Sequence, residues 1–451
     1  MSDNKPMGYD SLQYVLGQMD PTLRFIFVRR CPSIAHLDRR VPLKIRDLHF
    51  DPSRFKINDT TFSFGVIQIF NNDRTPRCVE EQNDRGGILK DVDRYGIDMR
   101  IRRNFGVEDE VRRRNLLKKL ELLMRVARTD RDLRKIQQVR EQLTLGDIRG
   151  LSYLLRSEGA EPPFTNYLQF IMRSNRGVWV ERLTYIRDVA EAREYILNML
   201  FGGAGRTVKV SNLHYEFNLD GDDPLAHNPF EVHHGEPRQV PAPALALGRD
   251  NPLLPLAPGK LELHHLKLAF NVRRVIDSIQ PVLWDKPLKT LETTSREMFE
   301  GVRRDPFVAS AERIIISERS TIGILSWFLN EKVHLQCSDF STEEVRDLLK
   351  YWQFRGLRIG TYYSIGFRDP GNIEDFLNDF KALPGAQRGE LAETRFTTFP
   401  ECIILPVRDF TELNVYCEET TAEDQKFCDR PYTVKIKVQP RGYAYNLYLR
   451  I

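Results

Sequence analysis

The sequence lacks any long run of apolar residues. Its longest apolar stretch, residues 322–329, is interrupted by a glycine and a serine, whereas a membrane-spanning helix needs about 20 apolar residues. The first thirty residues carry Asp3, Asp10 and Asp20 and lack the basic start and apolar core of a secretory signal. We therefore expect a cytoplasmic or nuclear protein that does not insert into a membrane.

Paired cysteine motifs and zinc-type histidine spacing are also absent. The cysteines are scattered without Cys-x-x-Cys spacing, which favours free thiols in a reducing compartment; they are Cys31, Cys78, Cys337, Cys402, Cys417 and Cys428. Five histidines lie close together in the chain but lack the spacing and the cysteines of a zinc site; they are His227, His233, His234, His264 and His265. We expect no metal site.

The sequence has no GxSxG, HExxH, GxxxxGK[ST] or protein-kinase motif. The stretch Gly202 to Arg206, GGAGR, is similar to a phosphate-binding loop, but it follows a predicted helix and precedes a predicted strand. A phosphate loop needs the opposite order, because the N–H groups at a helix start bind the anion. We interpret GGAGR as a helix end, and we expect a non-catalytic protein without a cofactor.

Basic residues gather in one part of a chain whose net charge is only +4. Between Arg100 and Leu143 there are 14 Lys or Arg and 7 Asp or Glu. Apolar residues on one stripe predict a long helix over Glu108–Leu143, with basic residues on its other faces, among them Arg112, Arg113, Arg114, Lys118 and Lys119. Such a row can bind nucleic acid, but a solvated face on a packed helix explains it too, and we favour that second interpretation.

The 451 residues, of which 41% are apolar, suffice for about three domains of roughly 150 residues each. Residues 1–42 show helical periodicity through Leu12, Val15, Leu16 and Met19, with Asp10 or Ser11 as the expected cap and a break at Asp20-Pro21. Alternating apolar residues over 43–70 predict a β-meander. We expect a surface loop over 71–96, a helix from Asp188 to Gly202 and a strand over 208–217.

The proline-rich stretch 218–259 lacks apolar periodicity and is interpreted as a linker. After it, strands and helices alternate over 260–451. We expect helices over Val272–Leu283, Met298–Val308 and 322–329, one starting with the capping box at Ser341, and one capped by Asn372, followed by three strands. The predicted domains are thus 1–42, 43–217 and 260–451.

The predicted strand centres of the C-terminal part recur at a nearly constant interval. Leu266, Leu291, Ile315, Leu335 and Tyr363 are 25, 24, 20 and 28 residues apart, within the range of about 20 to 29 residues of leucine-rich repeats. Only the unit from Leu263 to Asn271 fits that repeat consensus, so we predict a degenerate β/α repeat layer. The expected fold class is α+β, with an N-terminal helical segment, a β-meander with the long basic helix, and this leucine-rich-repeat-like layer.

Several segments together resemble a nematode family of uncharacterised proteins with an F-box-like N-terminus and F-box-associated domains of unknown function. They are GYDSLQYVLGQMDPTLRFIFVRRCPSIAHLDRRVPLKI at the N-terminus, NDRGGILKDVDRYG at Asn83–Gly96, and the segments around Glu191–Leu213 and Trp352. The chain departs from an ordinary F-box in having Met7-Gly8 where Leu-Pro is usual.

The resemblance implies that residues 1–42 dock on a Skp-type adaptor of a cullin ubiquitin ligase while the rest recognises a target protein. The residues expected to contact the adaptor are Tyr9, Leu12, Val15, Leu16, Asp20, Pro21 and Ile26. We therefore expect a non-catalytic protein-interaction module and substrate receptor. The alternative is a nucleic-acid-associated protein that binds through the basic helix over 100–143.

Overall fold

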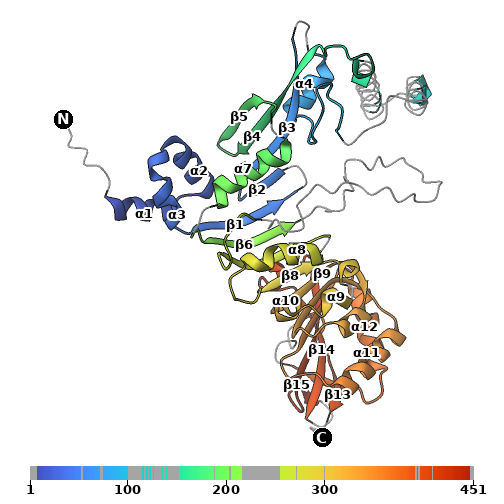
Figure 1. Ribbon diagram of the computed structural model, residues 1–451. Helices are drawn as coiled ribbons and strands as arrows, with labels where there is room; N and C mark the ends of the chain where they lie inside the picture. Colours follow the sequence, from blue (N-terminus) through green and yellow to red (C-terminus); the bar gives the residue numbers. More distant parts are fainter. Residues whose placement is uncertain are drawn as a thin grey trace. The chain divides into compact units, whose positions relative to one another are not determined.

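The structure, a computed structural model, describes most of the chain in a few continuous stretches. They are residues 8–51, 54–71, 75–99, 155–186, 188–202, 205–215 and 254–446, without 271, 299, 392–393, 395–396 and 409, together with scattered residues between 114 and 153. Most of the predicted linker at 218–259, up to residue 253, and most of the predicted basic helix lie outside the described residues. The described chain is mixed α+β and divides into two units (Figure 1).

The first unit begins with three short helices. These are α1 (Tyr9–Gln18), α2 (Pro21–Arg30) and α3 (Ala35–Arg40). The predicted break is confirmed, because the Asp20 side chain accepts the N–H groups of Thr22 and Leu23 at the start of α2. The predicted cap of α1 by Asp10 or Ser11 is wrong: the helix already begins at Tyr9, and its N-cap, Gly8, has no side chain to cap with.

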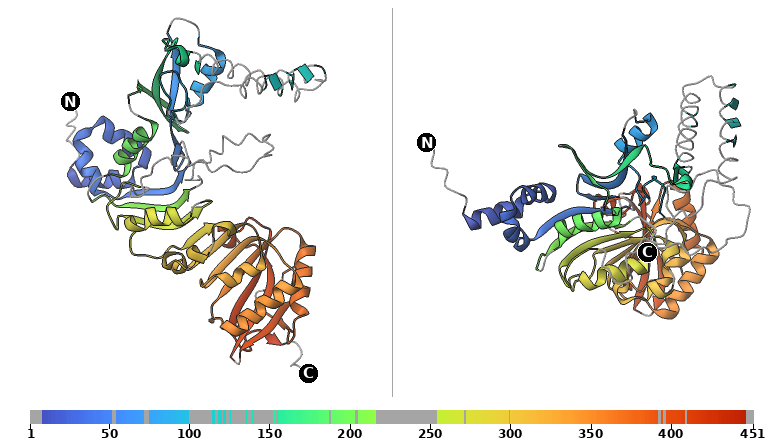
Figure 2. Two further views of the ribbon diagram at one scale, coloured as in Figure 1. Left: turned by 45° about the vertical axis from the view of Figure 1, so that its right-hand side comes forward. Right: turned by 45° about the horizontal axis from the view of Figure 1, so that its top comes forward.

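Seven parallel strands form the centre of the first unit. In sheet order they are β1 (Leu43–Phe50), β6 (Val208–Tyr215), β7 (Leu261–Leu268), β8 (Thr290–Thr293), β9 (Arg313–Thr321), β10 (Lys332–Asp339) and β11 (Tyr362–Phe367). From β6 onward each strand lies beside the next one in the sequence, and Figure 2 follows this progression from green through yellow to orange. β6 and β7 are hydrogen-bonded neighbours although the predicted linker separates them.

One row of buried apolar side chains crosses all seven strands. In register these residues are Leu48, Leu213, Leu266, Leu291, Ile314, Val333 and Tyr363. The predicted strand centres Leu266, Leu291 and Tyr363 belong to this row, whereas the predicted Ile315 and Leu335 lie one and two residues beyond it. In β10 it is Val333 that lies opposite Tyr363, whereas Leu335 lies opposite Ile365. The structure shows a parallel β/α layer, and the leucine-rich-repeat likeness stays a prediction.

Helices and 3-10 turns cover the face of the sheet that carries this apolar row. They are α8 (Val272–Ile279), α9 (Glu300–Arg303), α10 (Pro306–Ser310), the 3-10 turn Ile322–Trp327, α11 (Thr342–Arg355) and α12 (Pro370–Lys381). α11 follows its predicted course, from the Ser341 cap to Gly356. Its Trp352 is buried and stacks on Tyr363 of the row, with ring centroids 5.2 Å apart.

Three helix predictions and one strand prediction in this part need correction. The segment predicted as a helix over 322–329 is the 3-10 turn Ile322–Trp327, and Phe328 after it is extended. The helix expected over Met298–Val308 is interrupted, because Asp305 caps a new helix that starts at Pro306. α12 is capped by Asp369, which accepts the N–H of Gly371, rather than by Asn372. Five strands rather than three follow α12: β12 (Gln387–Glu390), β13 (Cys402–Arg408), β14 (Thr411–Glu419), β15 (Tyr432–Pro440) and β16 (Tyr445–Asn446). These five extend the sheet from β11 in antiparallel order.

The second unit, residues 51–202, is built on an antiparallel sheet. Its strands are β2 (Arg54–Ile57), β3 (Thr60–Phe70), β4 (Phe164–Ser174) and β5 (Gly177–Thr184). A two-residue turn at Asn58-Asp59 joins β2 to β3, and Asn58 has the positive φ of 51° that such a turn requires. The helix predicted from Asp188 is α7 (Val189–Phe201), and the Asp188 side chain caps it by accepting the N–H of Glu191. Of the meander predicted over 43–70, β2 and β3 are antiparallel neighbours, whereas β1 is parallel to β6 in the other unit. The strands β4 and β5, which were not predicted, extend this antiparallel sheet.

Within the segment predicted to be a surface loop, residues 71–96, the described residues 75–96 pack into the second unit. It contains α4 (Arg77–Asp84), whose Val79 is buried. The Asn83 side chain makes two hydrogen bonds to the backbone of Gln68 in β3. Gly87 lies so close to β3 that a Cβ atom there would be 2.5 Å from the carbonyl oxygen of Val66. Gly87 of the NDRGG sequence therefore allows close packing against β3.

We predict that Gly87→Ala destabilises the second unit by about 3 kcal/mol, since the methyl group meets the β3 backbone and φ is +86°. Gly159→Ala is the matched control, because Gly159 also has positive φ, +65°, but a methyl group there would have no atom within 4 Å. It should cost about 1 kcal/mol. Hydrogen exchange of the β3 and β4 amides measures both values, and equal protection in the two variants would contradict the packing argument.

Candidate functional site

The N-terminal helices are anchored to the first unit by a buried ion cluster. Asp38 of α3 accepts hydrogen bonds from Arg24 of α2 and from Arg206, which lies just before β6. All three side chains are at most 5% exposed. Arg24 also donates to the carbonyl oxygens of Val41 at 2.6 Å and Pro42 at 3.0 Å. The cluster thus joins two helices to the chain that enters β1 and β6.

The seven residues predicted to contact an adaptor have unequal exposure. Tyr9 and Val15 are exposed, at 53% and 36%, and Tyr14 beside them on α1 is 71% exposed. Leu12 and Ile26 are half-buried, and Asp20 caps α2. Leu16 and Pro21 are buried; Leu16 packs with Leu37 and Val41 in the core of this segment. Tyr9, Tyr14 and Val15 are therefore accessible at the surface, whereas Leu16 holds the helix.

We predict that Asp38→Ala destabilises the first unit by about 3 to 5 kcal/mol, because it leaves two buried guanidinium groups without a counter-charge. Asp277→Ala serves as the control. Asp277 pairs with Arg273 at the surface, where its side chain is 52% exposed, so its loss should cost less than about 1 kcal/mol. Urea unfolding measures the difference, and similar costs would show that the cluster does not hold the fold.

The basic stretch predicted between Arg100 and Leu143 is described only in part. Arg114, Lys118 and Lys119 are helical and exposed, and Val139 is helical and buried. Arg112 and Arg113 lie outside the described residues. The described positions agree with a helix that has a basic exposed face.

The face of the parallel sheet opposite the helices carries polar side chains on four neighbouring strands, β1, β6, β7 and β8. One row across the strands consists of Asp47, Asn212, His265 and Thr290, and the next of His49, His214, Lys267 and Glu292. We call these two rows the polar face. Asn212 donates to Asp47 at 2.7 Å, and Lys267 pairs with Glu292 at 2.7 Å. Burial lowers the pKa of His214 and His265, which keeps both imidazoles neutral at pH 7.

The polar face ends at β9, where the segment between β14 and β15 covers the sheet. Phe427 of this segment packs on Ile315 of β9 and lies 5.0 Å, centroid to centroid, from His334 of β10. His334 is fully buried and bonds to Ser364 through Nδ1 at 2.9 Å. Burial lowers the pKa of His334 to about 4. The open part of the polar face is therefore limited to β1, β6, β7 and β8.

We predict that His334 makes the protein less stable in mild acid. The unfolded chain takes up a proton on this histidine below about pH 6.5, whereas the folded chain does so only near pH 4, so stability is complete above pH 6.5 and is lost as the pH falls toward 4. Between pH 7 and pH 5 the loss should be about 2 kcal/mol. Urea unfolding at both pH values should show this difference reduced in His334→Asn and unchanged in the control His36→Asn, whose side chain is exposed.

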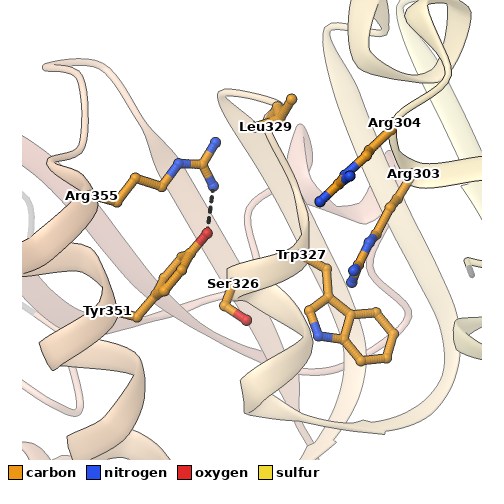
Figure 3. A pocket seen from close by; sticks show the side chains of 7 residues that line it. All are labelled: Arg303, Arg304, Ser326, Trp327, Leu329, Tyr351 and Arg355. Atoms are coloured by element: carbon orange, nitrogen blue, oxygen red, sulfur yellow. Dashed lines mark hydrogen bonds between the residues drawn. The ribbon is translucent and has the colours of Figure 1, made fainter. Parts of the chain in front are cut away.

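A cavity of about 430 Å³ lies on the helix side of the first unit (Figure 3). Seven residues line it: Arg303, Arg304, Ser326, Trp327, Leu329, Tyr351 and Arg355. Arg303 closes α9 and Arg304 follows it, Ser326 and Trp327 end the 3-10 turn, and Tyr351 and Arg355 lie one turn apart on α11. We call this the arginine pocket. Figure 3 shows the Arg355 side chain on one side of it and those of Arg303 and Arg304 on the other.

Each arginine of the pocket is held differently. The Arg303 guanidinium lies 5.2 Å from the ring centroid of Trp327. Arg355 donates to the Tyr351 hydroxyl at 3.1 Å and to the Phe328 carbonyl at 3.3 Å. Arg304 pairs with Glu300 at 2.9 Å. Within the described part of the chain, neither Arg303 nor Arg355 has a carboxylate partner, so the pocket has a surplus of positive charge.

The sequence patterns did not reveal the buried cluster or the arginine pocket. Arg24 interrupts an otherwise apolar run in α2 that extends from Leu23 to Val28. This interruption is the one local signal that a charge is buried in the segment.

Residues 240–369 match a family described as a domain of unknown function (DUF3557). The match covers less than half of the chain. It includes β7 to β11 and all residues of the arginine pocket, but no residue of the N-terminal helices. No curated protein and no solved structure matches the chain. The F-box-like resemblance therefore stays a prediction.

No helix in the described parts of the chain is both long enough and apolar enough to cross a membrane. His264 and His265, two of the clustered histidines, lie on β7, with ring centroids 6.4 Å apart. The other three, at 227, 233 and 234, lie outside the described residues.

Proposed function

We propose that the protein is a non-catalytic protein-interaction module that acts in the cytoplasm or nucleus. The observation that carries the proposal is the exposed surface of α1, on which Tyr9 lies in the first turn and Tyr14 and Val15 lie further along, while the buried Leu16 fixes the helix. Tyrosines on a rigid element are favoured at protein interfaces, since they offer a large contact area at little entropic cost. The buried cluster of Arg24, Asp38 and Arg206 supplies that rigidity.

The partner proposed for this face is a Skp-type adaptor of a cullin ubiquitin ligase, so that the protein would be a substrate receptor. The F-box-like resemblance of residues 1–42 supports this choice, as do the break at Asp20-Pro21 and the two helices around it. The target would then bind to the parallel β/α layer of the first unit. The polar face is suited to this role because its charges are paired across neighbouring strands and are half-exposed.

An exposed tryptophan beside the polar face supports a target surface there. Trp284 is 44% exposed, and the ammonium groups of Lys209 and Lys286 lie 5.9 and 5.1 Å from its ring centroid. Lys209 also pairs with Glu262 of β7 at 2.7 Å. Tryptophan is among the residues most enriched in interface hot spots.

A nucleic-acid-associated function is the second candidate. It is favoured by one observation, the exposure of Arg114, Lys118 and Lys119 on a helix. Binding through these residues would weaken steeply as salt is raised, because bound cations release counterions from the phosphates.

We predict that the full chain binds a purified Skp-type adaptor and that Tyr14→Ala combined with Val15→Asp weakens this binding at least about tenfold, through loss of contact area and a buried charge. Tyr195→Ala is the control, since Tyr195 is 55% exposed on α7 in the other unit. Isothermal titration calorimetry measures both. Absence of adaptor binding at tens of micromolar would reject the receptor proposal, and tight, salt-sensitive RNA binding lost in Arg114→Ala/Lys118→Ala/Lys119→Ala would favour the second candidate.

A further inference from the structure

We propose that the arginine pocket binds a phosphorylated segment of a partner protein. Three guanidinium groups from α9, the residue after it, and α11 line one cavity, and among the described residues only one of them is paired with a carboxylate. The surplus is thus two positive charges. A phosphoryl group carries about −1.5 to −2 charges at pH 7, so it matches this surplus better than a single carboxylate does.

The geometry of the pocket also suits a phosphoryl group. An arginine can donate two parallel hydrogen bonds to phosphate oxygens. Arg303 is oriented by its stacking on Trp327, and Arg355 by its hydrogen bonds to Tyr351 and Phe328. Because both side chains are already held, binding an anion costs them little conformational entropy. The positive charges of the three arginines repel one another in the free pocket, and a bound anion reduces this repulsion.

The surroundings favour a peptide over a nucleic acid. Trp327 and Leu329 line the pocket and are 43% and 57% exposed, and Phe354 on α11 is 85% exposed. These apolar groups can receive the side chains that flank a phosphorylated residue. A nucleic acid presents a row of phosphates and is bound by a track of cations, whereas these three guanidinium groups converge on a single volume of about 430 Å³.

This inference deepens the proposed interaction function, because it names the chemistry of the target that the parallel β/α layer would recognise. The two can fail separately. The adaptor experiment tests α1, and the pocket experiment below uses no adaptor and changes no residue of the N-terminal helices.

The test uses the full chain and fluorescein-labelled random heptapeptide libraries with a central phosphoserine, phosphothreonine or phosphotyrosine, each beside its unphosphorylated counterpart. Fluorescence anisotropy should show binding of at least one phosphorylated library and none of its counterpart at the same concentration. Arg303→Gln and Arg355→Gln should each weaken binding about tenfold or more, since each removes a charge-assisted hydrogen-bond donor. The control Arg296→Gln, at an exposed site outside the pocket, should stay within about twofold of the unchanged protein.

Thermal unfolding accompanies each variant, so that a loss of binding in a folded protein is separated from a loss of fold. Equal binding of phosphorylated and unphosphorylated libraries would overturn the proposal, as would variants that bind as well as the unchanged protein. Competition by inorganic phosphate at the same concentration as the phosphopeptide would show a site for the free anion. Tighter competition by a single-stranded RNA oligonucleotide would assign the pocket to nucleic acid, and either result rejects the peptide.

Discussion

Parallel pairing in one register is the constraint on which the first unit depends. Side chains alternate between the two faces of a strand, so a shift of one residue in any strand would move its apolar residues to the opposite face. The row from Leu48 to Tyr363 has no such shift across seven strands, and its members are at most 2% exposed. One face of the sheet is therefore apolar and covered by helices, while the opposite face is polar on β1, β6, β7 and β8. The helices that cover the apolar face also form the arginine pocket, so the pocket depends on the same register.

The buried cluster of Arg24, Asp38 and Arg206 holds the three N-terminal helices on the first unit. Three short helices have too little apolar surface to fold alone, because helices of this length are marginal in water. Leu16, Leu37 and Val41 give them a small core, and the cluster then joins them to the chain before β6. One carboxylate between two guanidinium groups still leaves a positive charge, and Arg24 directs its remaining N–H groups to the carbonyl oxygens of Val41 and Pro42. Burial lowers the pKa of Arg206, because desolvation opposes its positive charge. Such a cluster specifies geometry more than it adds stability.

Local signals in the sequence predicted most single elements and few of the contacts between them. The strand Tyr362–Phe367 and the helix after Ser341 follow from alternation and a cap, which depend on adjacent residues only. The choice of Asp369 over Asn372 as a cap was missed, although Pro370 at the first helical position is a local signal for it. The pairing of β6 with β7 could not be predicted, because the long stretch between Tyr215 and Leu261 carries no periodicity that fixes a partner. The Asp38 to Arg206 contact and the arginine pocket join residues from distant segments, and no spacing rule applies to such pairs.

The two faces of the parallel β/α layer differ in how their charges are satisfied, and this difference decides what each can bind. On the polar face, Lys267 has Glu292 and Lys209 has Glu262, so a partner must match a nearly neutral pattern of paired charges. Such a surface selects by shape and by the position of its charges. In the arginine pocket, Arg303 and Arg355 lack a carboxylate partner among the described residues, so an anion can add its interaction without first breaking an ion pair. A protein with both kinds of surface can recognise a target by its folded shape and by its phosphorylation. If the target loses its phosphoryl group, only the binding energy of the arginine pocket is lost, and the contacts on the polar face remain.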